Sequence, residues 1–374
     1  MEIIREGFTV ELEDPTLYVD NKSRRRSGHM SHALAQFAPG KFIDFNSNCS
    51  AVRWDGHSAY GWIEYRISED AGKTYSEVYE FPYSTESFYD GIYTISVEKA
   101  VACDDGTIIA FCLRNCAYTY GCVSPLSSPM VVRSYDGGKS WTKPYEFSPH
   151  KGRIYDSLYR DGVIYALMKR STDWGGNGPE DVHILYKSTD NGASFQEISA
   201  LPFDYKNRGY GALVFDEKGD LHAYILNSEA VCDLEHTVSH NNGLNWEAVD
   251  IKHFAKGGNN PQIAFIDGIY LLHGRSRNCD GYILYTSKDA VNWDEGTYIS
   301  DKAGLCYYSN HLVLKDEKGQ SFLLLQYSEI YGDSTETSDT SQIARDIFAG
   351  LKVPRLGNSR VNVMHRILKI KKTN

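Results

Sequence analysis

Short runs of apolar and polar residues, many of them joined by glycine turns, follow one another along most of this chain. Six such turns separate pairs of runs: Pro39-Gly40, Asp105-Gly106, Asp161-Gly162, Lys218-Gly219, Asp267-Gly268 and Lys318-Gly319. A dipeptide that ends in glycine, placed between two short apolar runs, is a strong hairpin signal, because glycine readily adopts the positive φ of tight turns. The pattern therefore predicts six units built from β-hairpins.

A second periodic signal is an octet with the pattern Ser-x-Asp-x-Gly-x-(Ser/Thr/Asn)-aromatic. It occurs at residues 68–75, 134–141, 188–195 and 239–246, and in a form one residue shorter and without glycine at 287–293. The Asp side chain can accept bonds from nearby backbone N–H groups, and the aromatic residue can pack on the sheet below. One copy would be an ordinary turn, but five copies predict a repeat architecture.

The two signals together predict four strands per unit, with the octet between the third and the fourth. In the second unit the predicted strands are residues 97–102, 107–113, 130–133 and 143–147. The last unit takes its strands from residues 308–314, 321–327 and 362–370, and the strand predicted at residues 2–10 would complete it and leave no open edge around the ring. Residues 11–28 are predicted to be a loop, and residues 341–351 are predicted to form the only helix.

The octets resemble Asp-boxes, or BNR repeats, the hairpin turns of β-propellers in the sialidase (neuraminidase) superfamily. This resemblance covers most of the chain. It implies an all-β fold, a six-bladed β-propeller that occupies residues 1–374 as a single domain and is closed by pairing of the N- and C-terminal strands.

In a four-strand blade, the glycine turns and the octets lie on one face, so the starts of the first strands and the second-to-third loops lie on the other. We expect the functional site on that opposite face. Its predicted lining from strand starts is His29, His32, Ser96, Glu98, Tyr155, Asp156, Arg208, Tyr210, Asn260, Gln262, Tyr307, Tyr308 and Asn310. The loops add Asn46, Asn48, Arg53, Asp55, His57, Arg114, Arg170, Arg275, Arg277 and Glu329.

Sialidases bind the substrate carboxylate with three arginines, use a tyrosine nucleophile activated by a glutamate, and use an aspartate as acid/base. Tyr308, in a Tyr-Ser-Asn stretch, resembles the family's nucleophile, and Asp55, in an Asp-Gly-His stretch, resembles its acid/base residue. Arg275 or Arg277 stands near the place of the last family arginine.

The chain departs from the family pattern at three places. His32 follows Met-Ser where the family's first arginine would stand, Tyr210 lies between two glycines where the activating glutamate would stand, and Asn227 takes the place of another arginine. The arginine triad is therefore degenerate. We expect little or no activity on a generic N-acetylneuraminic acid glycoside, because a carboxylate buried without a guanidinium fork loses charge-assisted bonds.

From these residues we predict a carbohydrate-active enzyme, a sialidase-like glycosidase that acts on a terminal acidic sugar but is not an ordinary sialidase. Tyr308 would be the nucleophile or its remnant, Asp55 the acid/base residue, and His32 a base or a cation near neutral pH. The predicted substrate-binding residues are Arg114, Arg170, Arg275, Arg277, Asp156, Tyr210, Asn260 and Asn227. Two alternatives stay open: a polysaccharide lyase with His32 or Tyr308 as its base, and a non-catalytic propeller that binds glycans or another protein.

Composition narrows the partners. A formal net charge of −10 argues against nucleic acid and anionic membrane surfaces, and 27 tyrosines, 6 tryptophans and 15 phenylalanines suit a β-rich fold with surfaces on which sugars stack. No apolar run is long enough to span a membrane, and no signal-peptide core opens the chain, so we expect a cytoplasmic protein or one released by a non-classical route.

The chain has eight cysteines and no Cys-x-x-Cys pair. We expect free, mostly buried thiols and a reducing compartment. The spacing of Cys112, Cys116 and Cys122 hints at metal binding, but no histidine lies near them in sequence. No metal and no cofactor are expected, and the expected partner is a glycan or small sugar.

Overall fold

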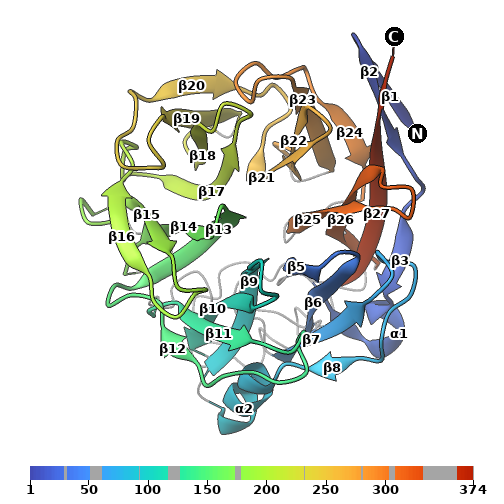
Figure 1. Cartoon of the computed structure of the whole chain (residues 1–374), viewed down its shortest axis with the longest axis vertical. Helices are drawn as coiled ribbons and strands as arrows, with labels where there is room; N and C mark the ends of the chain where they lie inside the picture. Colours follow the sequence, from blue (N-terminus) through green and yellow to red (C-terminus); the bar gives the residue numbers. More distant parts are fainter. Residues whose placement is uncertain are drawn as a thin grey trace, which may run out of the picture.

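The computed structural model describes residues 1–28, 32–50, 61–91, 93–116, 127–172, 178–230, 232–278, 281–302, 308–331 and 360–373, without the side chains of Ser50 and Cys116. Six antiparallel sheets surround a central axis, and each sheet is one blade of a six-bladed β-propeller (Figure 1). The predicted fold class is confirmed. The innermost strands of the six blades are β5, β9, β13, β17, β21 and β25 (Figure 1).

Blades 2 to 5 have four strands each and follow the chain in order. Blade 2 comprises β9 (Tyr93–Ala102), β10 (Ile108–Cys116), β11 (Met130–Ser134) and β12 (Tyr145–Glu146). Blade 3 comprises β13 (Gly152–Arg160), β14 (Val163–Arg170), β15 (His183–Ser188) and β16 (Gln196–Ala200). Blade 4 comprises β17 (Arg208–Phe215), β18 (Leu221–Asn227), β19 (Asp233–Ser239) and β20 (Asp250–His253). Blade 5 comprises β21 (Asn259–Ile266), β22 (Ile269–Arg275), β23 (Tyr282–Ser287) and β24 (Thr297–Ser300).

Blades 1 and 6 are less regular. Blade 1 comprises β4 (Arg26–Ser27), β5 (Leu34–Ala38), β6 (Lys41–Ser50), β7 (Gly61–Ser68) and β8 (Tyr79–Glu80), with β4 and β5 both paired to β6. Blade 6 comprises β25 (Ser309–Lys315), β26 (Ser321–Ile330), β27 (Val361–Lys372), β2 (Phe8–Leu12) and β1 (Glu2–Arg5), and β3 (Thr16–Val19) also pairs with β27.

The two ends of the chain close the ring within blade 6, as predicted. Strand β2 pairs antiparallel with β27, so that Val10 lies opposite Ile370 and Leu12 opposite Leu368. Val10 and Leu368 are fully buried in the apolar cluster that this blade shares with blade 5. The single strand predicted at residues 2–10 is instead a hairpin, because Gly7 at φ 84° turns β1 back onto β2.

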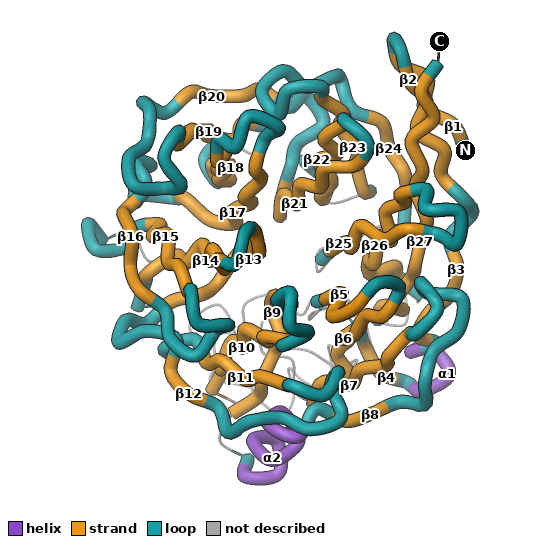
Figure 2. Tube along the Cα trace, in the orientation of Figure 1, coloured by secondary structure: helices purple, strands orange, loops and turns teal. Residues whose placement is uncertain are grey.

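Two other predictions about local structure were wrong. Residues 11–28 hold the end of β2, strands β3 and β4 and the short helix α1 (Asn21–Arg24), whose first turn is capped by the Asp20 carboxylate. A further helix, α2 (Pro82–Asp90), starts with a proline in its first turn and ends at Gly91 with φ 76°. Both helices lie on the periphery (Figure 2). The helix predicted at 341–351 lies outside the described residues.

Apolar side chains of facing sheets fill the spaces between neighbouring blades. Between blades 1 and 2, for example, Ile43 and Phe45 pack with Val97 and Ile108, and all four are fully buried. Each blade thus buries both of its faces, which agrees with strands rich in Ile, Val and Leu. Among the described residues, no helix is long and apolar enough to cross a membrane.

The five recurring octets form turns held by bonds within each octet. In the second, the Ser134 hydroxyl accepts from the Gly138 N–H at 2.8 Å, and Asp136 Oδ1 accepts from the Ser140 N–H at 2.9 Å. Asp70, Asp190, Asn241 and Asp289 accept the equivalent backbone bonds in the other four turns. The aromatic Trp141 donates its indole N–H to Tyr65 of blade 1 at 3.2 Å, so this turn also fastens two blades together.

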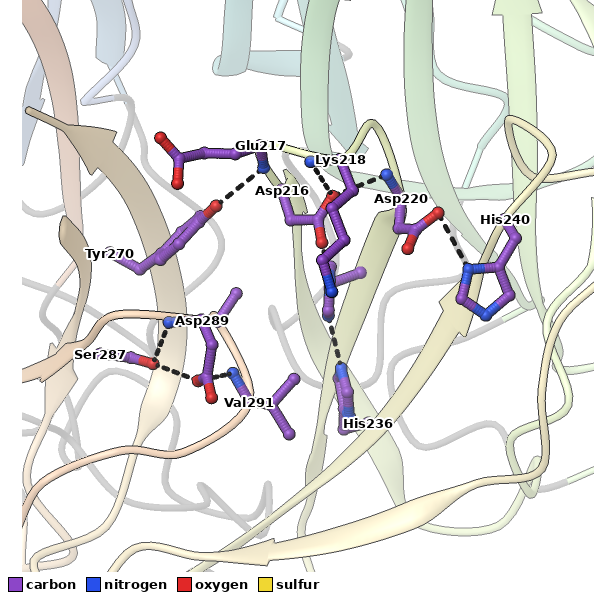
Figure 3. Close-up of polar contacts among 12 residues, drawn as sticks. Asp216, Glu217, Lys218, Asp220, His236, His240, Tyr270, Ser287, Asp289 and Val291 are labelled. Atoms are coloured by element: carbon purple, nitrogen blue, oxygen red, sulfur yellow. Dashed lines mark hydrogen bonds and ion pairs between the residues drawn. The ribbon is translucent and has the colours of Figure 1, made fainter. Parts of the chain in front are cut away.

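The glycine turns and the octet turns lie on the same face, as predicted; we call it the turn face. The Ala71 N–H bonds to the Gly40 carbonyl at 2.8 Å, and the Asn191 side chain bonds to Asp105 at 2.7 Å. Figure 3 shows this face between blades 4 and 5, where the N–H of Glu217 donates to the Tyr270 hydroxyl at 3.2 Å and Asp289 holds its own turn. The opposite side, where the inner strands begin, is the open face.

Candidate functional site

The inner strands enclose a small cavity where they begin, on the open face. It measures about 40 Å³, and we call it the axial cavity. Its lining residues are His32, Glu98, Lys99, Arg153, Ile154, Tyr155, Tyr210, Gly211, Asn260, Gln262, Tyr308, Ser309 and Asn310. Such a volume admits a group of a few atoms, but not a whole sugar ring.

A β-bulge interrupts the inner strand of four consecutive blades at the level of this cavity. The regular pairing with the second strand skips Glu98 in β9, Tyr155 in β13, Gly209 and Tyr210 in β17, and Asn260 and Pro261 in β21. A bulge inserts an extra residue and re-aims its side chain. Glu98, Tyr155, Tyr210 and Asn260 all line the cavity, so the bulges build its wall. In blade 6, β25 pairs without a bulge.

A buried ion pair joins blades 2 and 3 inside the cavity. Arg153 Nε donates to Glu98 Oε2 at 2.6 Å, and Arg153 Nη2 contacts the same oxygen. The exposed fractions of the two side chains are 3% and 8%. Burial by itself lowers the pKa of Arg153, but the Glu98 carboxylate and the surrounding tyrosines outweigh it and raise that pKa above its ordinary value. Arg153 is therefore a permanent cation with its own counter-ion.

Three tyrosines surround this guanidinium and form what we call the tyrosine cage. Arg153 Cζ lies 5.4 Å from the ring centre of Tyr155, 5.5 Å from that of Tyr210 and 5.7 Å from that of Tyr308. These distances are within the range of a cation–π interaction. The tyrosines come from blades 3, 4 and 6, so one arginine organises the aromatic wall across the axis.

The Tyr308 hydroxyl faces another phenol. Its hydroxyl lies 3.3 Å from the Tyr210 hydroxyl, and its backbone carbonyl accepts from the Tyr282 hydroxyl at 2.9 Å. Burial and Tyr210 raise the pKa of Tyr308 well above its ordinary value, although Arg153 and Arg275 act in the opposite direction. Arg275 Cζ is 6.0 Å from the Tyr308 ring centre. In the resting protein Tyr308 is a neutral phenol.

A second buried ion pair forms the floor. Lys99 Nζ lies 3.0 Å from Asp156 Oδ1, donates to Asn310 Oδ1 at 3.3 Å and also bonds to Gln262. The other Asp156 oxygen accepts from the Leu213 N–H at 2.7 Å. This cluster ties together the inner strands of blades 2 to 6. Asp156, predicted to bind substrate, lies in this floor. Beneath the floor a wider cavity of about 540 Å³, which Asp156 also lines, extends toward the turn face.

His32 is held by two bonds from blade 6. Its Nδ1 lies 3.1 Å from Gln326 Oε1 and its Nε2 lies 2.6 Å from Ser328 Oγ. Burial is the main reason why the pKa of His32 falls to about 3; the Gln326 bond opposes this and His365 adds to it. An imidazole with this pKa is uncharged at neutral pH and is a weak base. This pKa disfavours the predicted charge on His32 near neutral pH, and the role of His32 as a base stays a prediction.

Four other predicted residues do not line the axial cavity. Arg114 lies over the ring of Tyr93 at 4.7 Å, and Arg170 Nε donates to the Glu180 carbonyl at 3.0 Å. Asn227 Oδ1 accepts from Arg208 and from the N–H of Glu229 at 3.0 Å, so it caps a turn. Arg277 is exposed to solvent.

The structure therefore gathers Tyr308, Tyr210, Asn260 and His32 in one cavity and brings Arg275 close to Tyr308. Asp55 lies outside the described residues. The sequence pattern placed Glu98 on the open face without giving it a role, and it did not single out Arg153. One feature of the sequence could have pointed to Arg153: it stands two residues before Tyr155, at the start of a strand. However, side chains are assigned to faces by their alternation along a strand, and the bulge at Tyr155 interrupts that alternation.

Cys103 and Cys112 are buried free thiols, Cys49 is a buried cysteine, and Cys232 is a free thiol that is half-buried. Cys122, Cys279 and Cys306 lie outside the described residues, as does the side chain of Cys116. Within the described part of the chain, no three His, Cys, Asp or Glu side chains are placed so that they could hold a metal ion.

Sequence comparison gives no relatives: no family model matches the chain, and no curated protein matches it. Solved structures do match. A protein of unknown function from Dyadobacter fermentans has a TM-score of 0.67 at 14% identity, covering 97% of this chain and 99% of that one. The Hadza microbial sialidase Hz136 has a TM-score of 0.66 at 12% identity, covering 96% of this chain and 68% of that one.

A third match is the α-L-arabinanase of Penicillium chrysogenum, solved in complex with arabinobiose. It has a TM-score of 0.57 at 13% identity, covering 95% of this chain and 98% of that one. At these identities the likeness is one of fold, and fold alone does not determine chemistry. The chain shares the β-propeller fold of proteins that include a sialidase and an arabinanase.

Proposed function

We propose that this protein is a carbohydrate-active enzyme, a sialidase-like glycoside hydrolase that binds a terminal sugar at the axial cavity. The observation that carries the proposal is the row of β-bulges in blades 2 to 5. Each bulge interrupts regular strand pairing at the level of the axial cavity and directs a polar or aromatic side chain into that cavity. Blade 6 pairs without a bulge there, so the propeller fold does not itself require these irregularities.

The chemistry of the cavity wall suits a sugar. Tyrosine faces pack against the apolar faces of pyranose or furanose rings, and the Asn260 and Gln262 amides and the Glu98 carboxylate can exchange hydrogen bonds with sugar hydroxyls. Because the cavity holds only a few atoms, one substituent of the sugar would occupy it. Such a site recognises the end of a chain better than its middle.

For hydrolysis we assign Tyr308 as the nucleophile and Asp55 as the acid/base residue, following the family resemblance. The positive charges of Arg153 and Arg275 near the Tyr308 ring favour a phenolate, whereas burial and the Tyr210 hydroxyl disfavour it. Tyr308 must therefore pass its proton to a base during the reaction. Glu98 is bonded to Arg153, so our candidate is Asp55 in its ionised form, which would accept the Tyr308 proton and then deliver it to the leaving-group oxygen.

The Tyr210–Tyr308 pair also favours a second candidate function, glycan binding without catalysis. Two neutral phenols 3.3 Å apart bind hydroxyl groups without any activation. For the lyase alternative, burial lowers the pKa of His32 to about 3 and makes it a weak base. Tyr308 is the other candidate base for it.

A panel of fluorogenic glycosides with different terminal sugars, together with a glycan array, separates these functions. For the hydrolase we expect product from at least one glycoside, and loss of that product in Tyr308→Phe with binding retained. Tyr135→Phe is the matched control, since Tyr135 is exposed on the turn face. Binding without product would establish the second candidate, an unsaturated product absorbing in the ultraviolet would indicate a lyase, and neither binding nor product would refute the proposal.

A further inference from the structure

We infer that Glu98 is a specificity-determining residue of the axial cavity. The Glu98 carboxylate neutralises the charge of Arg153, and the cavity thereby selects uncharged, hydroxyl-rich sugars over sugars that carry a carboxylate. The inference rests on the proposed function and names its substrate class. It differs from the sequence-based expectation that the substrate is an acidic sugar. That expectation depended on four arginines, Arg114, Arg170, Arg275 and Arg277, binding the sugar carboxylate. Of these four arginines, Arg275 is the one that approaches the tyrosine cage.

The first argument is the geometry of the guanidinium. A carboxylate ligand is bound most strongly when two neighbouring N–H groups of an arginine point at it. Two nitrogens of Arg153, Nε and Nη2, already converge on Glu98 Oε2. A substrate carboxylate at that edge of Arg153 would have to displace Glu98 or lie directly beside it.

The second argument is the charge of the cavity. Arg153 with Glu98 and Lys99 with Asp156 form two buried pairs, and the exposed fraction of each of these four side chains is 8% or less. Each pair sums to zero charge. Among the described residues that line the cavity, an incoming carboxylate would find no net cation to offset the loss of its hydration; Arg275 lies outside that lining, 6.0 Å from the Tyr308 ring centre.

The third argument is what Glu98 offers in place of a cation. An ionised carboxylate only accepts hydrogen bonds, so its natural partners in a ligand are O–H and N–H groups. The bulge in β9 turns Glu98 into the cavity, which the amide groups of Asn260 and Gln262 also line. A sugar hydroxyl can donate to Glu98 while its ring contacts the tyrosine cage.

A test compares sugars that differ in a single substituent. Galactoside and galacturonide, or glucoside and glucuronide, share a ring and differ in a hydroxymethyl group against a carboxylate. For whichever ring binds, we expect the wild-type protein to bind the neutral member at least about tenfold more tightly. In Glu98→Gln, which keeps the shape and removes the charge, we expect that ratio to shift at least about tenfold toward the uronide.

Glu146→Gln is the matched control, because Glu146 is exposed on the outer strand of the same blade. It should leave the ratio unchanged. The inference is overturned if the wild-type protein prefers the uronide, or if Glu98→Gln leaves the ratio as it was. If no glycan binds to either protein, the proposed function has failed, and a second measurement then decides the inference alone.

That second measurement is rescue by a small carboxylate. In Glu98→Ala the cavity gains space beside a buried Arg153 that has lost its counter-ion. We expect sodium acetate to raise the Tm of this variant by about 2–4 °C more than sodium chloride of equal concentration does, through binding to the folded state. The wild-type protein should show no such difference. If acetate has no selective effect on Glu98→Ala, Glu98 does not keep carboxylates from Arg153, and the inference is refuted.

Discussion

The turn face and the axial cavity satisfy their polar groups in opposite ways. Within the recurring turns of the turn face, partners are close in sequence: Asp136 bonds to residues two and four positions away, and the same bonds recur in the other turns. In the cavity, Arg153 and Glu98 are 55 residues apart, Tyr210 and Tyr308 are 98 apart, and Lys99 and Asn310 are 211 apart. One region is assembled by local repetition, the other by the closure of the ring.

This difference has energetic consequences. The turn carboxylates are largely exposed, so each loss removes a few hydrogen bonds from one of five similar turns. The cavity charges are buried and each ion pair occurs once, so removing one partner leaves the other as a buried charge with neither a counter-ion nor hydration. We therefore expect the cavity to respond more strongly than the turn face to a single substitution, and to respond in ligand binding as well as in stability.

The largest effect is expected for Tyr308→Phe. If Tyr308 is the nucleophile, removing its hydroxyl should lower kcat by roughly 10⁴-fold or more, with KM little changed. Steady-state kinetics on the best glycoside of the panel measures this. A variant that retains most of its kcat would remove Tyr308 from the chemistry and leave it a role in binding.

The next effect concerns the stability of the cavity. Arg153→Met should lower the free energy of unfolding by about 3–5 kcal/mol, because it leaves the Glu98 carboxylate buried without its counter-ion. Denaturant titration measures the loss. The double variant Arg153→Met, Glu98→Leu should be less destabilised than Arg153→Met alone, and equal or additive losses would mean that Glu98 is not the cause.

On the turn face the expected loss is smaller. Asp136→Ala should lower the free energy of unfolding by about 1–2 kcal/mol, through the bonds to Ser140 and Ser134 that its carboxylate accepts. Glycan binding should stay the same, since this turn lies on the face opposite the axial cavity. A change in sugar preference without a change in stability would contradict the assignment of the two faces.

The smallest effect is a dependence on pH. Burial alone would raise the pKa of Asp289, but bonds from Asn292, Val291 and Ser287 outweigh it and lower that pKa to about 2. A lowered folded-state pKa gives stability that is complete above the unfolded value near 4 and is lost as the pH falls toward 2.

The fourth turn tests this directly, because it has Asn241 in place of Asp and makes the same backbone bond. Asn241→Asp should gain up to about 1 kcal/mol at neutral pH, limited by solvent screening, and should lose that gain between about pH 4 and pH 2. Unfolding titrations at pH 7 and pH 2.5 compare the variant with the wild-type protein. A gain that persists at pH 2.5 would exclude a charge effect.

The sequence by itself determined the propeller, its six blades, the closure by the two termini and the division into two faces. These features depend on signals within a few residues, such as a glycine dipeptide or an Asp and the N–H groups that follow it, and each signal is repeated. It missed α2 and the small elements in residues 11–28, where no repeat supports the local pattern.

The sequence placed Glu98, Tyr155, Tyr210 and Asn260 on the open face, but only the tertiary structure decided how they form a cavity. The bulges at Glu98, Tyr155, Tyr210 and Asn260 change which side chains face the axis, and strict alternation along a strand cannot anticipate an inserted residue. Arg153 is buried beside Glu98 because the inner strands of the neighbouring blades 2 and 3 pack together, and burial against blade 6 disfavours a charge on His32. Pairing and burial of charges depend on neighbours far apart in the chain, and those neighbours exist only once the ring is closed.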